Sequence, residues 1–211
     1  MKFKSFLPLL AVLTLLIFSM VSTCVGTVVT FDDLSETASG SFIASPYHGF
    51  VWNDFFALNG VLNPAVFTGY PTNGYYYGTV SASNVAVADF GSPGEIDSSA
   101  TNFNFLSAYL TGAWNSNLNI EVQGFNGTNL LYDTTVVASA TNPTLFTFDY
   151  QNINRLLFNS SGGQPAFGTD PDPLLVMDNF TYELVPEPSP LLLTAAAALL
   201  LWPSLKRKRT T

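Results

Sequence analysis

Short apolar runs, several of which alternate with polar residues, follow one another along the middle of the chain. They are rich in β-branched and aromatic residues, which favour strands, and they lie at 27–31, 49–52, 84–88, 118–122, 145–148 and 174–177. A period of two residues is the pattern of a half-buried antiparallel strand. No segment of this middle region shows a convincing apolar period of 3.6 residues. The pattern therefore predicts an all-β domain.

Turn-forming pairs separate these runs. Gly, Pro and Asn supply the backbone conformations that tight turns need, and they occur between the runs at 59–60, 73–74, 92–94, 126–127, 142–143 and 161–163. The clearest hairpin turn is Asn126-Gly127-Thr128-Asn129, which lies between two alternating runs. Residues 27–184 are enough for one domain with a sizeable core. Many short strands with regular turns predict a single antiparallel β-sandwich or jelly roll.

The N-terminal end has a different pattern. Lys2 and Lys4 precede an uninterrupted apolar run at 6–21, which is typical of a secretory signal-peptide helix. We assign residues 1–26 to this signal and expect cleavage after Gly26, with cleavage after Cys24 as the second choice. An uncleaved membrane anchor and lipidation of Cys24 are the alternatives. The signal implies passage through the secretion translocon, and an exported domain without a disulfide.

The C-terminal tail, residues 185–211, has three consecutive parts. A proline-rich motif occupies 185–190, an uncharged segment 191–205 follows, and a basic end closes the chain at 206–209. As a helix the uncharged segment would be roughly 22 Å long, against about 30 Å for a bilayer core, and Pro203 weakens its last turn. Cations stay preferentially on the cytoplasmic side. We expect a marginal transmembrane helix and a transient membrane stop; a core or amphipathic helix is the alternative.

The tail closely resembles the PEP-CTERM sorting signal of exported bacterial proteins. The residues that carry this resemblance are the motif Val185, Pro186, Glu187 and Pro188, the apolar segment, and the basic stop Lys206, Arg207, Lys208 and Arg209. The family has a Val-Pro-Glu-Pro motif, a hydrophobic helix and an Arg-rich end in this order. The resemblance implies an exosortase-type processing enzyme as partner. It also implies an inner-membrane intermediate, followed by delivery to the cell surface or an exopolysaccharide matrix.

A second resemblance covers most of the middle region and lies in short strand motifs. The stretches 29–34, 49–55, 103–114, 122–125 and 176–183 are similar to galactose-binding-like and carbohydrate-binding jelly rolls found ahead of such tails. In similar jelly rolls an acid near the first strand and an Asp in the last strand share a structural calcium ion. The matching positions are Asp32 or Asp33, and Asp178. The alternative for Asp178 is a hydrogen bond to a neighbouring loop without metal, and we expect no other cofactor.

Charge narrows the function further. The chain carries a formal net charge of -8, all acidic residues except Glu187 lie between 27 and 185, and Arg155 is the sole cation there. This argues against a nucleic-acid partner, which needs clustered Lys and Arg. An acidic surface fits solubility outside the cell or binding of divalent cations.

Catalytic signatures are weak. The sequence has a single histidine, His48, and no Gly-x-Ser-x-Gly elbow that would accompany it in a catalytic triad. We expect His48 in a surface turn. Carboxylate pairs occur at 32–33, 95–97 and 170–172. Glycosidases need two carboxylates that face each other across a cleft, whereas Asp in loops commonly forms turns. We therefore do not expect an enzyme.

The candidate glycan-binding residues are tyrosines in a stretch rich in Gly and Asn, namely Tyr70, Tyr75, Tyr76 and Tyr77. Successive side chains of a strand point to opposite faces, so at least one of the three consecutive tyrosines should be exposed to stack on sugar rings. The sequence thus indicates an exported, structural or adhesive, non-catalytic protein of the envelope or matrix. The alternatives are a carbohydrate-binding module on surface polysaccharide and a secreted hydrolase.

Overall fold

The computed structural model describes residues 26–66, 70, 72–88, 92–98, 100–168 and 172–186. The predicted signal peptide up to residue 25 and the tail from Glu187 onward, with its apolar segment and basic end, lie outside the described residues. Among the described residues no helix is long and apolar enough to cross a membrane.

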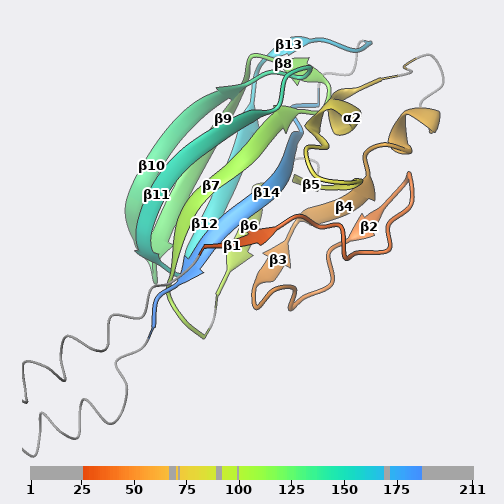
Figure 1. Cartoon of the computed structure of the whole chain (residues 1–211). Helices are drawn as coiled ribbons and strands as arrows, with labels where there is room; N and C mark the ends of the chain where they lie inside the picture. The colour runs from red at the N-terminus through yellow and green to blue at the C-terminus, as the bar shows by residue number, and fades with distance from the viewer. Residues whose placement is uncertain are drawn as a thin grey trace, which may run out of the picture.

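Two antiparallel sheets packed face to face make up the described part of the chain (Figure 1). The seven-stranded sheet has the order β11-β7-β14-β5-β4-β2, with β1 beside β14. Its strands are β1 (Thr27–Val29), β2 (Ser41–Phe42), β4 (Phe55–Asn59), β5 (Asn84–Ala88), β7 (Phe103–Gly112), β11 (Thr144–Ile153) and β14 (Leu175–Leu184). The all-β sandwich predicted from the alternating pattern is confirmed.

The five-stranded sheet has the order β10-β9-β12-β6-β3. Its strands are β3 (Val51–Asn53), β6 (Gly94–Asp97), β9 (Leu118–Asn126), β10 (Asn129–Ala138) and β12 (Arg155–Ser161), and a short ribbon pairs β8 (Asn115–Ser116) with β13 (Gln164–Pro165). Asn126 pairs with Asn129 across the β9–β10 turn, where Gly127 has a φ of 59°. The hairpin turn predicted there is confirmed, because Gly adopts this left-handed conformation at little cost.

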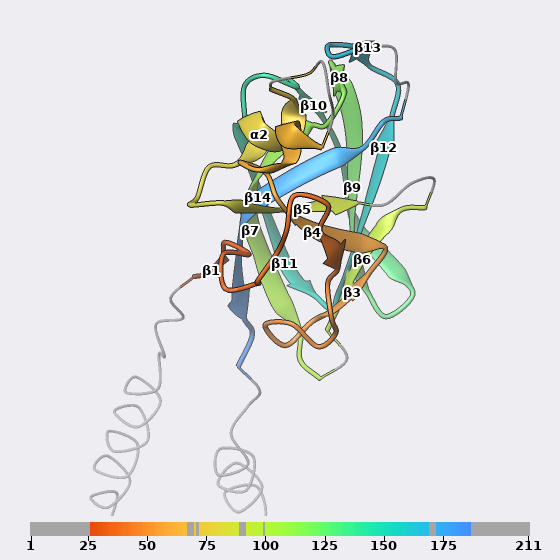
Figure 2. The same ribbon diagram turned by 90° about the vertical axis from the view of Figure 1, so that its right-hand side faces the viewer.

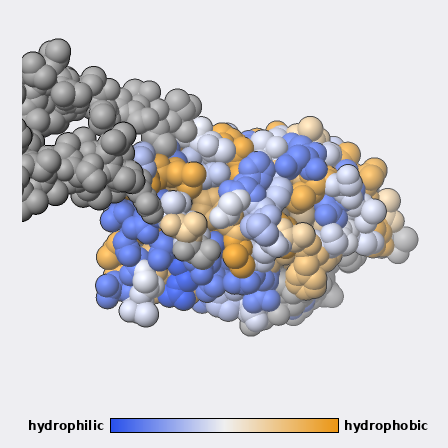
Figure 3. Space-filling view, turned by 90° about the horizontal axis from the view of Figure 1, so that it is seen from below, coloured by the Kyte–Doolittle hydropathy of each residue, from blue (hydrophilic) through white to orange (hydrophobic). Residues whose placement is uncertain are grey.

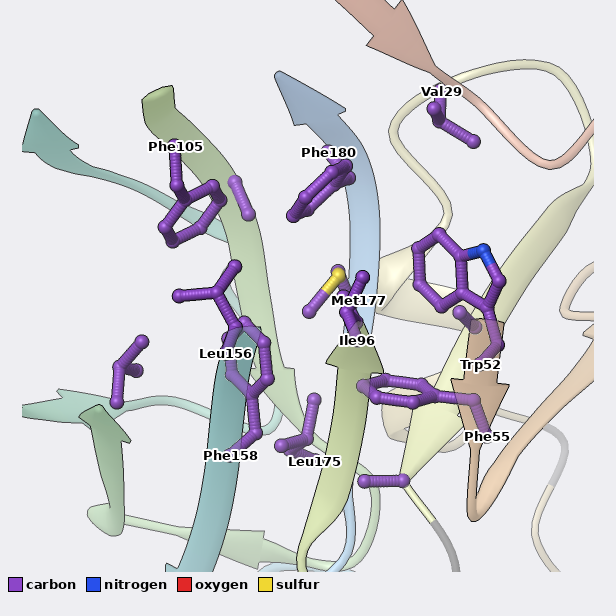
Figure 4. Close-up of a cluster of buried hydrophobic side chains, with 14 of the residues drawn as sticks. Val29, Trp52, Phe55, Ile96, Phe105, Leu156, Phe158, Leu175, Met177 and Phe180 are labelled. Carbon is purple, nitrogen blue, oxygen red and sulfur yellow. The ribbon is translucent and has the colours of Figure 1, made fainter. Parts of the chain in front are cut away.

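Aromatic rings from both sheets fill the space between the layers (Figure 4). Phe105 of β7 stacks on Phe180 of β14, with ring centroids 5.0 Å apart, and also meets Phe158 of the opposite sheet edge-on at 6.1 Å. All three rings are almost fully buried. Burying a side chain of this size stabilises the fold by about 1.5–3 kcal/mol, so this aromatic core holds the two sheets together.

A second, smaller core lies on the outer side of the seven-stranded sheet. Every residue of β5 is buried because its two faces serve different clusters: Ala86 and Ala88 point into the main core, while Val85 and Val87 belong to the second one. The second core is completed by residues from β4, β14, the helix α2 (Gly74–Gly78) and the segments just after β7 and just before β14, including Tyr75 and Trp114. The sheet is therefore covered on both faces at this point, and α2 forms the outer cover.

The two ends of the described chain leave the sandwich together. Strand β1 pairs with β14, so that Thr27 lies opposite Tyr182 near the end of the last strand. Figures 1 and 2 show these ends at the bottom of the sandwich, whereas α2 lies at the upper end. On the face shown in Figure 3, apolar residues lie in small groups among polar ones. Both described chain ends thus lie at the end of the sandwich away from α2.

Candidate functional site

The tyrosine stretch forms the helix α2, not the strand assumed in the sequence-based argument about its faces. Asn73 caps the helix: its side-chain oxygen accepts a hydrogen bond from the Tyr76 backbone amide at 3.1 Å. The Asn73 side chain also donates to Asn63 at 2.8 Å, which ties the helix to the one-turn 3₁₀ helix η1 (Asn63–Ala65). The helix turns the three tyrosines in different directions, so each has its own environment.

Close packing at Gly74 holds α2 on the sheet. A Cβ atom at this position would lie 1.9 Å from the Gly112 carbonyl oxygen and 2.5 Å from that of Ala113. The Gly74 amide donates to the Ala113 oxygen at 2.9 Å. Only glycine permits this approach of the helix to the end of β7.

Tyr75 is a core residue and does not face solvent. Its side chain is buried in the second core, where its ring meets Trp114 edge-on with centroids 5.6 Å apart. Tyr70 contacts the same Trp114 edge-on at 6.1 Å and is 36% exposed. Both tyrosines therefore serve chiefly to fix the helix and the segment before it.

Tyr76 and Tyr77 line an open depression of about 510 Å³ beside α2. The other lining residues come from the turn after β4 and from the loop between α2 and β5: Val61, Thr79, Val80, Ser81 and Ala82. Figure 2 shows α2 with this loop leading from it to β5. We call this depression the tyrosine groove; its size lies in the range of sites for small ligands, about 300–1,000 Å³.

The two tyrosines of the tyrosine groove differ in what they can offer a ligand. Tyr77 stacks on Phe167 with its ring 14° from parallel and 6.0 Å away, and its hydroxyl lies 3.3 Å from that of Thr72. Tyr76 meets Tyr77 edge-on, with the rings 83° apart, and remains 41% exposed. Tyr76 is therefore the ring that can present a face to a ligand.

Two aspartates that are far apart in the sequence, Asp32 and Asp178, hold the loop that lines the tyrosine groove. Asp178 on β14 is fully buried and accepts hydrogen bonds from the backbone amides of Val80 at 2.7 Å and Ser81 at 2.8 Å. It also accepts from the Ser81 hydroxyl at 2.9 Å. Asp32, after β1, accepts from the amides of Ser83 and Asn84 at 2.8 and 3.0 Å. We call this arrangement the aspartate clamp.

The clamp gives its two carboxyl groups opposite pKa shifts. Burial raises the pKa of Asp178, and the hydrogen bonds from Ser81 and Val80 offset only part of this effect. Burial also acts on Asp32, but the Asn84 and Ser83 amides outweigh it, so the pKa of Asp32 lies below its ordinary value. A carboxylate that accepts backbone N–H bonds is stabilised in its charged form.

The predicted calcium ligands are thus only partly brought together. Asp32 and Asp178 hold the same loop, whereas Asp33 accepts a hydrogen bond from the Tyr47 hydroxyl and lies 3.3 Å from His48 Nε2. Among the described residues no group of three or more His, Cys, Asp or Glu could hold a metal ion. Asp178 does not fit a calcium ligand, because each of its oxygens already accepts two hydrogen bonds: Oδ2 from the amides of Val80 and Ser81, and Oδ1 from the Ser81 hydroxyl and the Asn179 amide. The two amide bonds to Asp32 both reach its Oδ1.

The other candidate acids and His48 also have protein partners. His48 lies in the turn between Tyr47 and Phe50, with a φ of 50°. Glu95 accepts from Asn53 at 3.0 Å and lies 3.6 Å from Arg155, whose guanidinium stands over the Phe125 ring at 4.3 Å. Burial and the neighbouring Glu95 raise the pKa of Asp97. These contacts are those of surface ion pairs, and Asp170 of the remaining pair lies outside the described residues.

Comparison with known proteins gives no family. No family model and no curated protein matches the chain. Among solved structures it is similar to a DUF4465 family protein from Bacteroides ovatus ATCC 8483, with a TM-score of 0.40 and 10% identity. It is also similar to TmCBM61, solved in complex with beta-1,4-galactotriose, with a TM-score of 0.35 and 12% identity. Each match covers 75% of this chain and 94% of the other. Likeness at this level carries no argument about a ligand.

Proposed function

We propose that the sandwich is a non-catalytic carbohydrate-binding domain whose ligand lies against Tyr76 in the tyrosine groove. The observation that carries this proposal is the exposed Tyr76 ring beside a polar loop in an open depression. An aromatic ring offers an apolar face to the C–H side of a sugar, and its phenol offers a polar tip. The hydroxyl oxygens of Thr79 and Ser81 keep lone pairs that accept hydrogen bonds from sugar hydroxyls.

The rigidity of the site supports binding without a large ordering cost. The aspartate clamp fixes the loop from 79 to 84, and the Gly60 amide donates to the Ser83 oxygen at 2.9 Å, which joins the opposite wall to the same loop. Groups that are already ordered lose little freedom on binding. The helix α2 lies toward the upper end of the sandwich, away from the described chain ends, whereas the 79–84 loop reaches the segment after β1, where the Ser81 hydroxyl donates to the Thr30 oxygen at 3.3 Å (Figure 2).

A pull-down with the insoluble matrix polysaccharide of the source cells tests this proposal. The full chain is purified in a detergent without a sugar headgroup, and Tyr76→Ala is compared with Leu130→Ala. Leu130 is a matched control because it is 48% exposed on β10, at the other side of the sandwich from α2. Removing one stacking ring should weaken binding about tenfold, which corresponds to about 1.4 kcal/mol. Equal retention of the two variants would contradict the proposed site.

We further propose that the protein is exported and sorted through its tail to the cell surface or matrix, where it is structural or adhesive. The support for this proposal is the order of the Val-Pro-Glu-Pro motif, the apolar segment and the basic stop in the sequence. Replacing Pro186, Glu187 and Pro188 by Ala and fractionating the cells tests it. We expect the variant to remain in the membrane fraction with its tail attached. Normal surface delivery and tail removal in the variant would show that the motif is not the signal.

A further inference from the structure

Most backbone amides of the loop 79–84 donate to oxygen atoms of the protein itself. The backbone amides of Val80 and Ser81 donate to Asp178, those of Ser83 and Asn84 donate to Asp32, and that of Thr79 donates to the Tyr76 oxygen. Successive backbone amides of this kind can form an anion-binding concavity. Here the protein supplies the anions itself, in the two carboxylates of the aspartate clamp.

The residues that line the tyrosine groove carry no charge. The lining residues carry hydroxyl groups and apolar or aromatic side chains, and none of them is Lys, Arg or His. Four hydroxyl groups belong to the lining residues. Three of them donate within the protein: Thr79 Oγ1 to the Tyr75 oxygen at 2.9 Å, Ser81 Oγ to Asp178, and the Tyr77 hydroxyl to Thr72 at 3.3 Å. The phenol of the exposed Tyr76 is the remaining hydroxyl donor. The free lone pairs of the hydroxyl groups are acceptors. Such a surface suits a ligand that brings hydroxyl donors and does not suit a carboxylate, sulfate or phosphate.

The net charge of the region 27–185 also disfavours acidic ligands. Of the acidic residues in the sequence only Glu187 lies outside 27–185, and of the basic residues only Arg155 lies inside, so this region carries a net charge of -13, from 14 acids and one base. Arg155 is engaged with Glu95 on the five-stranded sheet. Like-charge repulsion therefore disfavours the approach of an acidic polymer to the domain, and salt weakens this repulsion.

We propose that the tyrosine groove selects uncharged polysaccharides and rejects acidic ones that carry uronate, sulfate or phosphate groups. This inference rests on the proposed carbohydrate-binding function and names the chemical class of its ligand. The aspartate clamp thereby has two effects: it shapes the groove, and it engages the amides of Val80, Ser81, Ser83 and Asn84, so that these four donors do not serve an anionic sugar.

Affinity electrophoresis of the full chain tests the inference. The gels contain matrix polysaccharide of the source cells, separated by anion exchange into a neutral and an acidic fraction, and the acidic fraction after chemical reduction of its carboxyl groups. The reduced polymer keeps the sugar linkages of the acidic one and loses its charge, so it is a matched probe. We expect retention by the neutral and reduced polymers, with binding to the acidic one weaker by about tenfold at low salt.

A gain-of-charge variant provides a second, independent measurement. Val61 lines the groove and is 47% exposed, so Val61→Lys should fold and should place a cation in an uncharged site. We expect this variant to gain retention by the acidic polymer. Equal or stronger retention of the unmodified protein by the acidic polymer overturns the selectivity. Absence of retention by all three polymers overturns the proposed function itself, and with it the inference.

Discussion

The aspartate clamp makes a quantitative prediction about Asp178. The substitution Asp178→Asn replaces one acceptor oxygen by an NH₂ group. In one orientation of the side chain this group faces the N–H donors of Val80 and Ser81, and in the flipped orientation it faces that of Asn179. Each buried N–H group that loses its acceptor costs about 1–3 kcal/mol. Val80 is 39% exposed, so water will satisfy part of the loss there. We expect a loss of about 3 kcal/mol in the free energy of unfolding.

This loss should be easy to measure against a total stability of about 5–15 kcal/mol. For a domain of this size, 1 kcal/mol shifts the melting temperature by about 2–4 °C, so Asp178→Asn should melt about 6–12 °C below the unmodified protein. The assay is thermal unfolding of the full chain followed by circular dichroism. Asp133→Asn is the matched control, because Asp133 is an exposed carboxylate on β10 with one bond from Gln123 at 3.2 Å.

The control should melt within about 2 °C of the unmodified protein, since substitutions of exposed residues usually change stability by less than about 0.5 kcal/mol. A melting temperature of Asp178→Asn as high as that of the control would refute the reasoning. The loop would then owe its position to other contacts, and the argument that its donors are withheld from the ligand would lose its basis.

Three further predictions concern other parts of the structure. Gly74→Ala should lower the free energy of unfolding by about 1–3 kcal/mol and abolish polysaccharide binding, because the added Cβ meets the Gly112 oxygen. Gly127→Ala, where an added Cβ has open space, should keep binding. Polysaccharide binding by Gly74→Ala would contradict the packing argument. The Tyr47 hydrogen bond holds the pKa of Asp33 in the folded protein below its usual 3.8. The ionised Asp33 therefore stabilises the fold fully above pH 3.8, and this stabilisation is lost as the pH falls through the lowered pKa of the folded protein. Asp33→Asn should flatten the acid limb of urea unfolding by less than about 1 kcal/mol, since Asp33 is 61% exposed, and an unchanged limb would refute this. Removal of calcium with a chelator should leave the melting temperature unchanged, whereas a rise of several degrees on adding calcium would restore the predicted calcium site.

Most strands could be predicted because their signal is local. In β9 the residues Leu118, Ile120 and Val122 are buried and those between them are more exposed, as the alternation required. The strand β5 was also predicted, although all of its residues are buried. Its alternating Val and Ala residues place Val on one face of the sheet and Ala on the other, so both faces are hydrophobic. The turn at Gly127 could also be predicted, because the hairpin needs a residue with positive φ at that point.

The helix α2 could not be predicted, and the aspartate clamp could be predicted only in part, because both depend on distant residues. Tyr has only a moderate helix propensity, and a five-residue helix is stable here through Asn73, Asn63 and the approach of Gly74 to β7. The bonds from Asp178 to Val80 and Ser81 join residues 98 and 97 positions apart. The resemblance to calcium-binding jelly rolls pointed to Asp32 and Asp178. The alternative for Asp178, a hydrogen bond to a neighbouring loop, is confirmed, whereas the bonds from the same loop to Asp32 are seen only in the three-dimensional arrangement.

The central claim is that polysaccharide binds in the tyrosine groove. Hydrogen–deuterium exchange of the full chain, with and without the matrix polysaccharide that it retains, tests this location most directly. We predict slower amide exchange in peptides that cover residues 76–82 and unchanged exchange in β10, on the other side of the sandwich. Slower exchange confined to β9 and β10, with none at 76–82, would contradict the account.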